Sequence, residues 1–223
     1  MIDVLHTVDL GLASHIIANI MFECVAAHAW GGANQEQNIE LMMDDMKAYY
    51  KRDKVVSKLQ GKMQIERLRT SKGWPKLKAK AAATRHLAQF ALELAERHLD
   101  QPRIFVCRLL CRFYQILESE GQFLTASAKE ELPGLGRRLG ELYCRLAQDA
   151  LARKVRMWKV SPKLHLFIHL CEWQAIELGN PTFYWVYSDE DLVGQMIEVA
   201  QTCHPTTVNA TALYKWALLA FES

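Results

Sequence analysis

The sequence lacks a long uninterrupted apolar run. The stretch from Val8 to Trp30 comes closest, but charged and polar residues interrupt it. It therefore falls short of the roughly 20 consecutive apolar residues that span a bilayer. The N-terminus also has no basic region followed by an apolar core, so no secretory signal is expected. These absences predict an intracellular protein with no membrane partner.

The cysteines lack the spacing of a metal or redox motif. Six cysteines are scattered through the chain, and none of them forms a C-x-x-C pair. In a chain of 223 residues this pattern predicts reduced, mostly buried thiols rather than a disulfide framework. The sequence also has no Gly-rich phosphate loop and no nucleophile elbow, so two common types of catalytic or nucleotide-binding motif are missing.

Signals for helix starts are frequent. Asn34 is suited to cap a helix that runs to about Tyr50, and residues 76–99 carry a strong helical pattern of apolar residues. Pro102 and Pro162 each suit the first turn of a further helix, because proline is favoured there. These segments predict a chain of successive helices.

Few segments favour strands. Only residues 1–6 and the aromatic run at 183–187 read as short strands, whereas Gly134 and Gly136 look like loop residues. The predicted fold is mainly α, a multi-helix bundle with at most two short strands near these two segments.

Positive charge is concentrated in one part of the chain. From Lys47 to Arg85 there are thirteen Lys or Arg residues against two acids, although the whole chain has a net charge of only +2. Lys and Arg side chains on one surface are what phosphate contacts require. Tyr49, Tyr50 and Trp74 flank the run and are placed to stack on bases or pack on sugars. The alternative is a solvated face of further helix, broken near Gly61. The predicted DNA contacts are Lys51, Arg52, Lys54, Lys58, Lys62, Arg69, Lys72, Lys76, Lys78 and Lys80.

Acidic residues occur at both ends of the chain in positions that suit metal chemistry. Asp3 and His6 lie near the N-terminus, and Asp189, Glu190 and Asp191 follow Ser188. Magnesium takes hard oxygen ligands, often only a few carboxylates, and such ions support phosphoryl transfer. The alternative reading is that the second group simply marks a helix N-terminus, where acids offset the helix dipole.

Two short motifs resemble those of a known family. The segment Asp3–Gly11 resembles the "D-x-x-H followed by L-G" segment of eukaryotic DDE/D cut-and-paste transposases of the CACTA and hAT-like kind. Residues 161–170 resemble the "K-x-H-x-L-x-H-L" segment upstream of the last catalytic acid in those proteins. The order and separation of the two segments also resemble the family, in which a large helical insertion separates the second catalytic Asp from the final Glu.

The resemblance implies a fold, a site and a partner. Residues 1–6 and 183–223 would be remnants of an RNase H-like core, and residues 7–180 the all-helical insertion. Asp3 and Glu190 would be the second and third catalytic acids and would bind magnesium. The family's first catalytic Asp would lie before Met1, so this chain is expected to bind DNA in the nucleus without turnover. A missing N-terminal half or a second copy of the chain would be the partner.

His165 and His169 are accessory candidates, together with His6. Their i, i+4 separation on an expected helix is a legitimate metal-ligand spacing. The motif has no Glu of the H-E-x-x-H type, so hydrolytic zinc chemistry is not indicated. The alternative is a pair of packed, hydrogen-bonded histidines.

A second function class remains open. An all-helical interaction module with no catalytic site would dock a protein partner through faces that carry tryptophan and methionine. Met42, Met43 and Met46 suit either the core or such an interface. Such a module would show little salt-sensitive binding to DNA.

Overall fold

A computed structural model describes residues 1–184, 186, 196–204, 206–208 and 210–215. The chain divides into two compact units, Met1–Tyr184 and Trp185–Ser223. The described residues contain helices and no strand, which confirms the prediction of a mainly helical fold. The strand suggested for residues 1–6 is wrong, because the chain enters a helix at Val4. Of the segment 183–187, Phe183 lies in a short 3₁₀ turn, and residues 185 and 187 lie outside the described residues.

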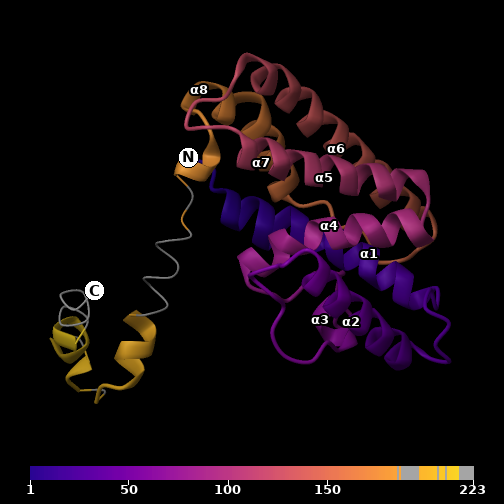
Figure 1. Cartoon of the computed structure of the whole chain (residues 1–223), viewed down its shortest axis with the longest axis horizontal. Helices are drawn as coiled ribbons and strands as arrows, with labels where there is room; N and C mark the ends of the chain where they lie inside the picture. The colour runs from indigo at the N-terminus through magenta and orange to yellow at the C-terminus, as the bar shows by residue number, and fades with distance from the viewer. Residues whose placement is uncertain (185, 187–195, 205, 209, 216–223) are drawn as a thin grey trace. The chain divides into compact units, whose positions relative to one another are not determined.

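The first unit is a bundle of helices (Figure 1). Its elements, in chain order, are η1 (Leu5–Ala13), α1 (Ser14–Ala26), α2 (Gln35–Arg52), α3 (Ile65–Leu68), α4 (Ala81–His98), α5 (Gln101–Ser119), α6 (Ala126–Ala152), α7 (Pro162–His169), η2 (Leu170–Gln174), α8 (Ala175–Leu178) and η3 (Pro181–Phe183).

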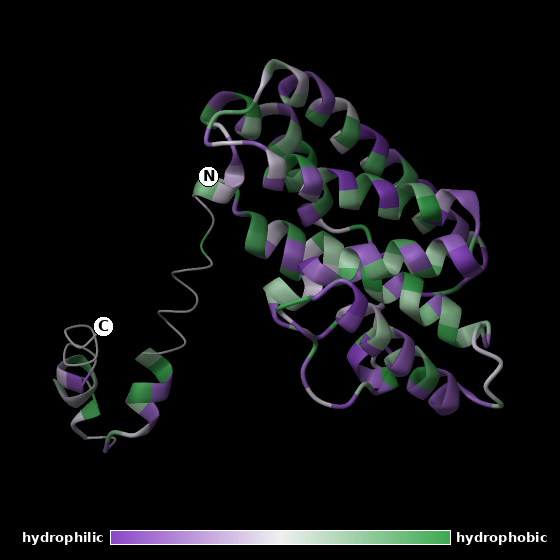
Figure 2. Ribbon diagram, viewed as in Figure 1, coloured by the Kyte–Doolittle hydropathy of each residue, from purple (hydrophilic) through white to green (hydrophobic). Residues whose placement is uncertain are grey.

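The helical stretch η1–α1, which is kinked at Gly11, lies at the centre of this unit. It packs against α4 and α7, α5 packs between α4 and α6, and α2 and α3 contact α1. Leu5–Ala26 is long and apolar enough to cross a membrane by length and composition, but 83% of the relevant window is buried inside the unit. Burial of this kind is what a central core helix requires. Apolar and polar residues alternate along the surrounding helices, as expected for elements with one buried face (Figure 2).

Three of the predicted helix starts are confirmed. The Asn34 side chain accepts a hydrogen bond from the Gln37 amide at 2.9 Å, and α2 runs from there to Arg52. Pro102 and Pro162 each lie in the first turn of a helix. Local sequence chemistry therefore determined where these helices begin.

The prediction that Gly134 and Gly136 lie in a loop is wrong. Helix α6 runs through both of them and through Pro133. A Cβ atom on Gly136 would lie 2.7 Å from the Cys171 Cβ, and one on Gly140 would lie 2.8 Å from Ile168 Cδ1. Gly136 and Gly140 therefore allow α6 to approach η2 and α7 closely. The loop prediction relied on the adjacent Pro133 and Gly134, and local sequence carries no information about such contacts between helices.

The helix expected through the basic segment is also largely absent. Residues 53–64 have no helix, and only Ile65–Leu68 forms a single short one. Apolar residues of the segment nevertheless reach the core, where Val55, Leu59 and Met63 are buried. We call residues 53–80, which are irregular apart from α3, the strap. Its buried apolar side chains hold it against the core, and its lysines are distributed around it instead of along one helix face.

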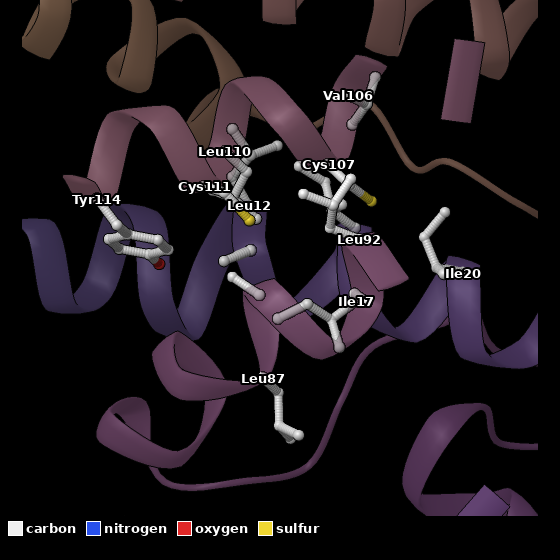
Figure 3. Close-up of a cluster of buried hydrophobic side chains, with 14 of the residues drawn as sticks. Leu12, Ile17, Ile20, Leu87, Leu92, Val106, Cys107, Leu110, Cys111 and Tyr114 are labelled. Atoms are coloured by element: carbon white, nitrogen blue, oxygen red, sulfur yellow. The ribbon is translucent and has the colours of Figure 1, made fainter. Parts of the chain in front are cut away.

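A buried carboxylate connects η1 to α5. Asp9, which is fully buried, accepts a hydrogen bond from the Tyr114 hydroxyl. Figure 3 shows Tyr114 turned towards the first helix beside Leu12, Cys111 and Leu110. The Arg85 guanidinium lies over the Tyr114 ring at 5.3 Å from its centroid. The polar cluster fixes α4, α5 and η1 together inside an otherwise apolar core.

In the second unit, residues 196–201 and 210–215 are helical. The Lys215 ammonium donates to the Thr202 hydroxyl at 3.0 Å, which links the two segments.

Candidate nucleic-acid interface

Four lysines from separate parts of the first unit line one hollow of about 700 Å³. We call this the lysine pocket and define it by Lys76, Lys78, Lys159 and Lys163. Residues of η1–α1, of the strap and of the start of α7 form the rest of its wall, and Glu66 is the one carboxylate among its lining residues. A concave surface with four ammonium groups and one carboxylate favours an anionic ligand.

The strap places Lys76 and Lys78 on the outward side of an extended segment. Leu77 lies between them and is buried, and its amide donates to the Ser14 carbonyl at 2.9 Å. The Lys78 amide donates to the Arg67 carbonyl at 2.9 Å, and the Arg67 guanidinium donates back to the Lys78 carbonyl at 3.0 Å. Side chains alternate along extended chain, so burying Leu77 exposes its two lysine neighbours.

The connection between α6 and α7 supplies the other two lysines. The Tyr143 hydroxyl donates to the Lys159 carbonyl at 3.0 Å, and Trp158 beside it is fully buried. Lys163 lies in the first turn of α7, and its ammonium donates to the His6 carbonyl at 2.6 Å. This contact brings the two segments that carry the family resemblance, 3–11 and 161–170, side by side.

Crowding of positive charge is evident in two neighbouring groups. Partial burial lowers the pKa of Lys163, and the charge of Lys76 lowers it further. Burial also lowers the pKa of His15, whose Nδ1 donates to the Pro75 carbonyl at 2.6 Å. Lys76, Lys159 and Lys163 add to that lowering by repulsion. An anion in the pocket would relieve this repulsion.

The lysine pocket includes two of the ten basic residues predicted to contact DNA, Lys76 and Lys78. Arg52 is paired with Asp53 and Glu93, and Arg69 is half-buried, stacked on Phe22 and bonded to the Gly73 carbonyl. The other predicted contacts are exposed but do not line the pocket, namely Lys51, Lys54, Lys58, Lys62, Lys72 and Lys80.

Sequence reasoning missed Lys159 and Lys163 as anion contacts. They lie about eighty residues beyond Lys76 and outside the basic run. Lys163 does stand in the motif that carries the family resemblance, which was the one available signal. Only the folded chain shows that these four lysines share a hollow.

Asp3 acts as a helix cap. Its Oδ2 accepts a hydrogen bond from the His6 amide at 2.8 Å and another from the His6 Nδ1 at 2.8 Å. Glu190 lies outside the described residues, as do Asp189 and Asp191. Among the residues that the structure describes, no group of three or more His, Cys, Asp or Glu side chains is placed to hold a metal ion. Asp3 therefore caps the first helical turn, and the magnesium site formed by Asp3 and Glu190 stays a prediction.

Replacing Asp3 by alanine should lower the free energy of unfolding by about 1 kcal/mol, because the His6 amide loses its partner. Asp3→Asn is the matched control, since asparagine caps helices about as well as aspartate. Urea unfolding followed by far-ultraviolet circular dichroism measures both. Equal losses in the two variants would contradict a capping role.

Four cysteines and several methionines are core residues, among them Cys24, Cys111, Met42 and Met46. Burial raises the pKa of Cys24 and of Cys111 to about 12, so both remain protonated thiols at neutral pH. Met42 and Met46 are fully buried and thus unavailable for docking. Trp158 is buried too, whereas Trp173 is 58% exposed. A docking face built on methionine is therefore not supported in α2.

His165 and His169 lie on the exposed side of α7, with their Nε2 atoms 2.9 Å apart. His6 is engaged with Asp3 instead and has a side-chain exposure of 54%. No family model, curated protein or solved structure matches the chain.

Proposed function

We propose that the first unit binds the phosphate backbone of DNA through the lysine pocket. The observation that carries this proposal is the convergence of Lys76, Lys78, Lys159 and Lys163 on one hollow that has a single lining carboxylate. Lysine ammonium groups are point charges that neutralise phosphates without reading bases. Binding would therefore be strong at low salt and weakly selective for sequence.

The lining of the pocket suits a nucleotide chain as well as an isolated phosphate. Trp74 is 39% exposed at its wall, and the pocket also includes Thr70 and Ser161. An indole face can pack on a sugar or base, while hydroxyl groups bond to phosphate oxygens. The pocket thus offers the charged and apolar contacts that a nucleic-acid strand requires.

The family resemblance supports DNA as the polyanion. Under it, the chain is a fragment or derivative of a DDE/D transposase that acts in the nucleus. The parent reaction would be magnesium-dependent strand cleavage and transfer, with Asp3 and Glu190 as ligands. The Asp3 carboxylate is engaged as a helix cap through two hydrogen bonds from His6, so turnover by this chain alone is not proposed. Binding is the activity proposed for it.

The second candidate is a protein-interaction module, and exposed apolar residues near the end of the first unit favour it. Phe123 is 76% exposed and Leu178 is 49% exposed. The Asn180 amide donates to the Gln122 carbonyl at 2.9 Å, which brings the two segments together. Exposed apolar patches of this kind often mark contacts with other proteins.

Titration of a fluorescent duplex with the protein at several salt concentrations separates the two candidates. Four lysine–phosphate contacts predict a slope of log K against log salt of about −3.6 or steeper. An interaction module would bind DNA weakly and with little salt dependence. Absence of binding at about 50 mM salt would refute the proposed function.

A further inference from the structure

Two histidine rings face each other on the exposed side of α7. His165 and His169 are one helical turn apart, and both are exposed. Their ring centroids are 4.3 Å apart with an interplanar angle of 81°, and their Nε2 atoms are 2.9 Å apart. The two nitrogens that are most often used as metal ligands thus point to one place in solvent.

A hydrogen bond is one account of this contact. One Nε2 would then donate and the other accept, since a neutral imidazole carries one N–H. A bond of this kind on an exposed face contributes little to stability, because water competes for both partners. The folded unit therefore gains little stability from this hydrogen bond.

The distance between the two nitrogens suits a particular class of metal. Imidazole nitrogens bind first-row divalent metals at about 2.0–2.1 Å. Two such ligands at a right angle are about 2.9 Å apart, whereas a tetrahedral angle separates them by about 3.3–3.4 Å. The observed 2.9 Å matches the right angle. Square-planar and octahedral ions such as copper(II) and nickel(II) have that angle, and both favour imidazole.

We propose that His165 and His169 form a two-imidazole chelate for a divalent transition metal of the copper(II) or nickel(II) class. The remaining positions are open to water or to a ligand from another molecule. This agrees with the finding that no group of three or more ligating side chains gathers among the described residues. The site is independent of the proposed DNA contacts, because His165 and His169 do not line the lysine pocket.

Calorimetric titration of the whole chain with nickel(II) or copper(II) tests the chelate. His165→Asn and His169→Asn should each lower the affinity for nickel(II) by at least about tenfold, as expected when a metal site loses a ligand or its support. The double variant should bind nickel(II) with about the same affinity as either single variant, because a single remaining imidazole cannot chelate the metal. Acidification should release the metal, since protonated imidazoles do not bind it.

His86→Asn is the matched control. It removes one exposed imidazole from α4. Residues 82 and 90, one helical turn to either side, are not histidine, so His86 has no second imidazole with which to chelate a metal. The control should bind as tightly as the wild type. The electron paramagnetic resonance spectrum of bound copper(II) should show coupling to two nitrogens in the wild type. Nickel(II) affinity within about twofold of the wild type in His165→Asn or His169→Asn would overturn the proposal, as would an equal loss in His86→Asn.

Discussion

A variant in which Lys76, Lys78, Lys159 and Lys163 are all replaced by glutamine should lose most of its affinity for DNA. Each lysine that neutralises a phosphate contributes about 0.9 to the slope of log K against log salt. Removing four contacts should therefore reduce the slope by about 3.6. Binding that weakens about 150-fold between 50 and 200 mM salt in the wild type should become nearly independent of salt in the variant.

The control for this experiment removes the same charge from elsewhere on the unit. Lys51, Lys54, Lys58 and Lys62 are exposed, belong to the basic run and do not line the pocket. Their joint replacement by glutamine changes the net charge equally. It should reduce the affinity only modestly, through the loss of long-range attraction. If this control loses as much affinity as the pocket variant, a diffuse basic surface binds DNA and the pocket has no special role.

Retention of the fold can be checked directly in both variants. The four pocket lysines are surface groups, although the Lys163 ammonium also donates to the His6 carbonyl at 2.6 Å. Glutamine keeps a donor at this position, so helix content by circular dichroism should stay unchanged. A single Lys163→Gln variant separates the effect of this contact from the effect of charge.

The helices were predictable where one residue determines a local event. Asn34 caps α2 and Pro102 lies in the first turn of α5, because a cap and a proline act within a single turn. The course of α6 was not predictable in this way. Gly136 serves a contact with Cys171, thirty-five residues away, and local propensity carries no information about that contact.

The candidate site was predictable only in its general chemistry. The excess of lysine indicated a polyanion partner, but the run from Lys47 to Arg85 holds only half of the lysine pocket. A count of charges does not say which lysines share a surface. In the fold, the burial of Leu77 directs Lys76 and Lys78 to the same exposed side. Asp9 shows the same limit, because nothing in its local sequence indicates that the fold buries its carboxylate against the Tyr114 hydroxyl, 105 residues away.

The largest effect on stability is expected from Glu23→Ala. The Glu23 carboxylate pairs with the Arg103 guanidinium through two hydrogen bonds, and their side chains are only 17% and 10% exposed. Glu23 also accepts a hydrogen bond from the Trp158 indole at 3.0 Å. Burial opposes the charge of Arg103, but its bonds to Glu23 and Asp100 outweigh that cost and raise its pKa. Removing Glu23 thus leaves a largely buried cation and an indole N–H without this partner.

Loss of one partner from a buried ion pair costs about 3–5 kcal/mol. Urea unfolding followed by circular dichroism should show Glu23→Ala destabilised by this amount. Glu96→Ala, which breaks an exposed pair with Arg108, should cost no more than about 1 kcal/mol. Combining Glu23→Leu with Arg103→Met should recover much of the loss, because the largely buried cation, which then has only Asp100 as a partner, is removed and only the indole N–H lacks Glu23. If the double variant is as unstable as Glu23→Ala, the cost lies in packing around Trp158 and not in the buried charge.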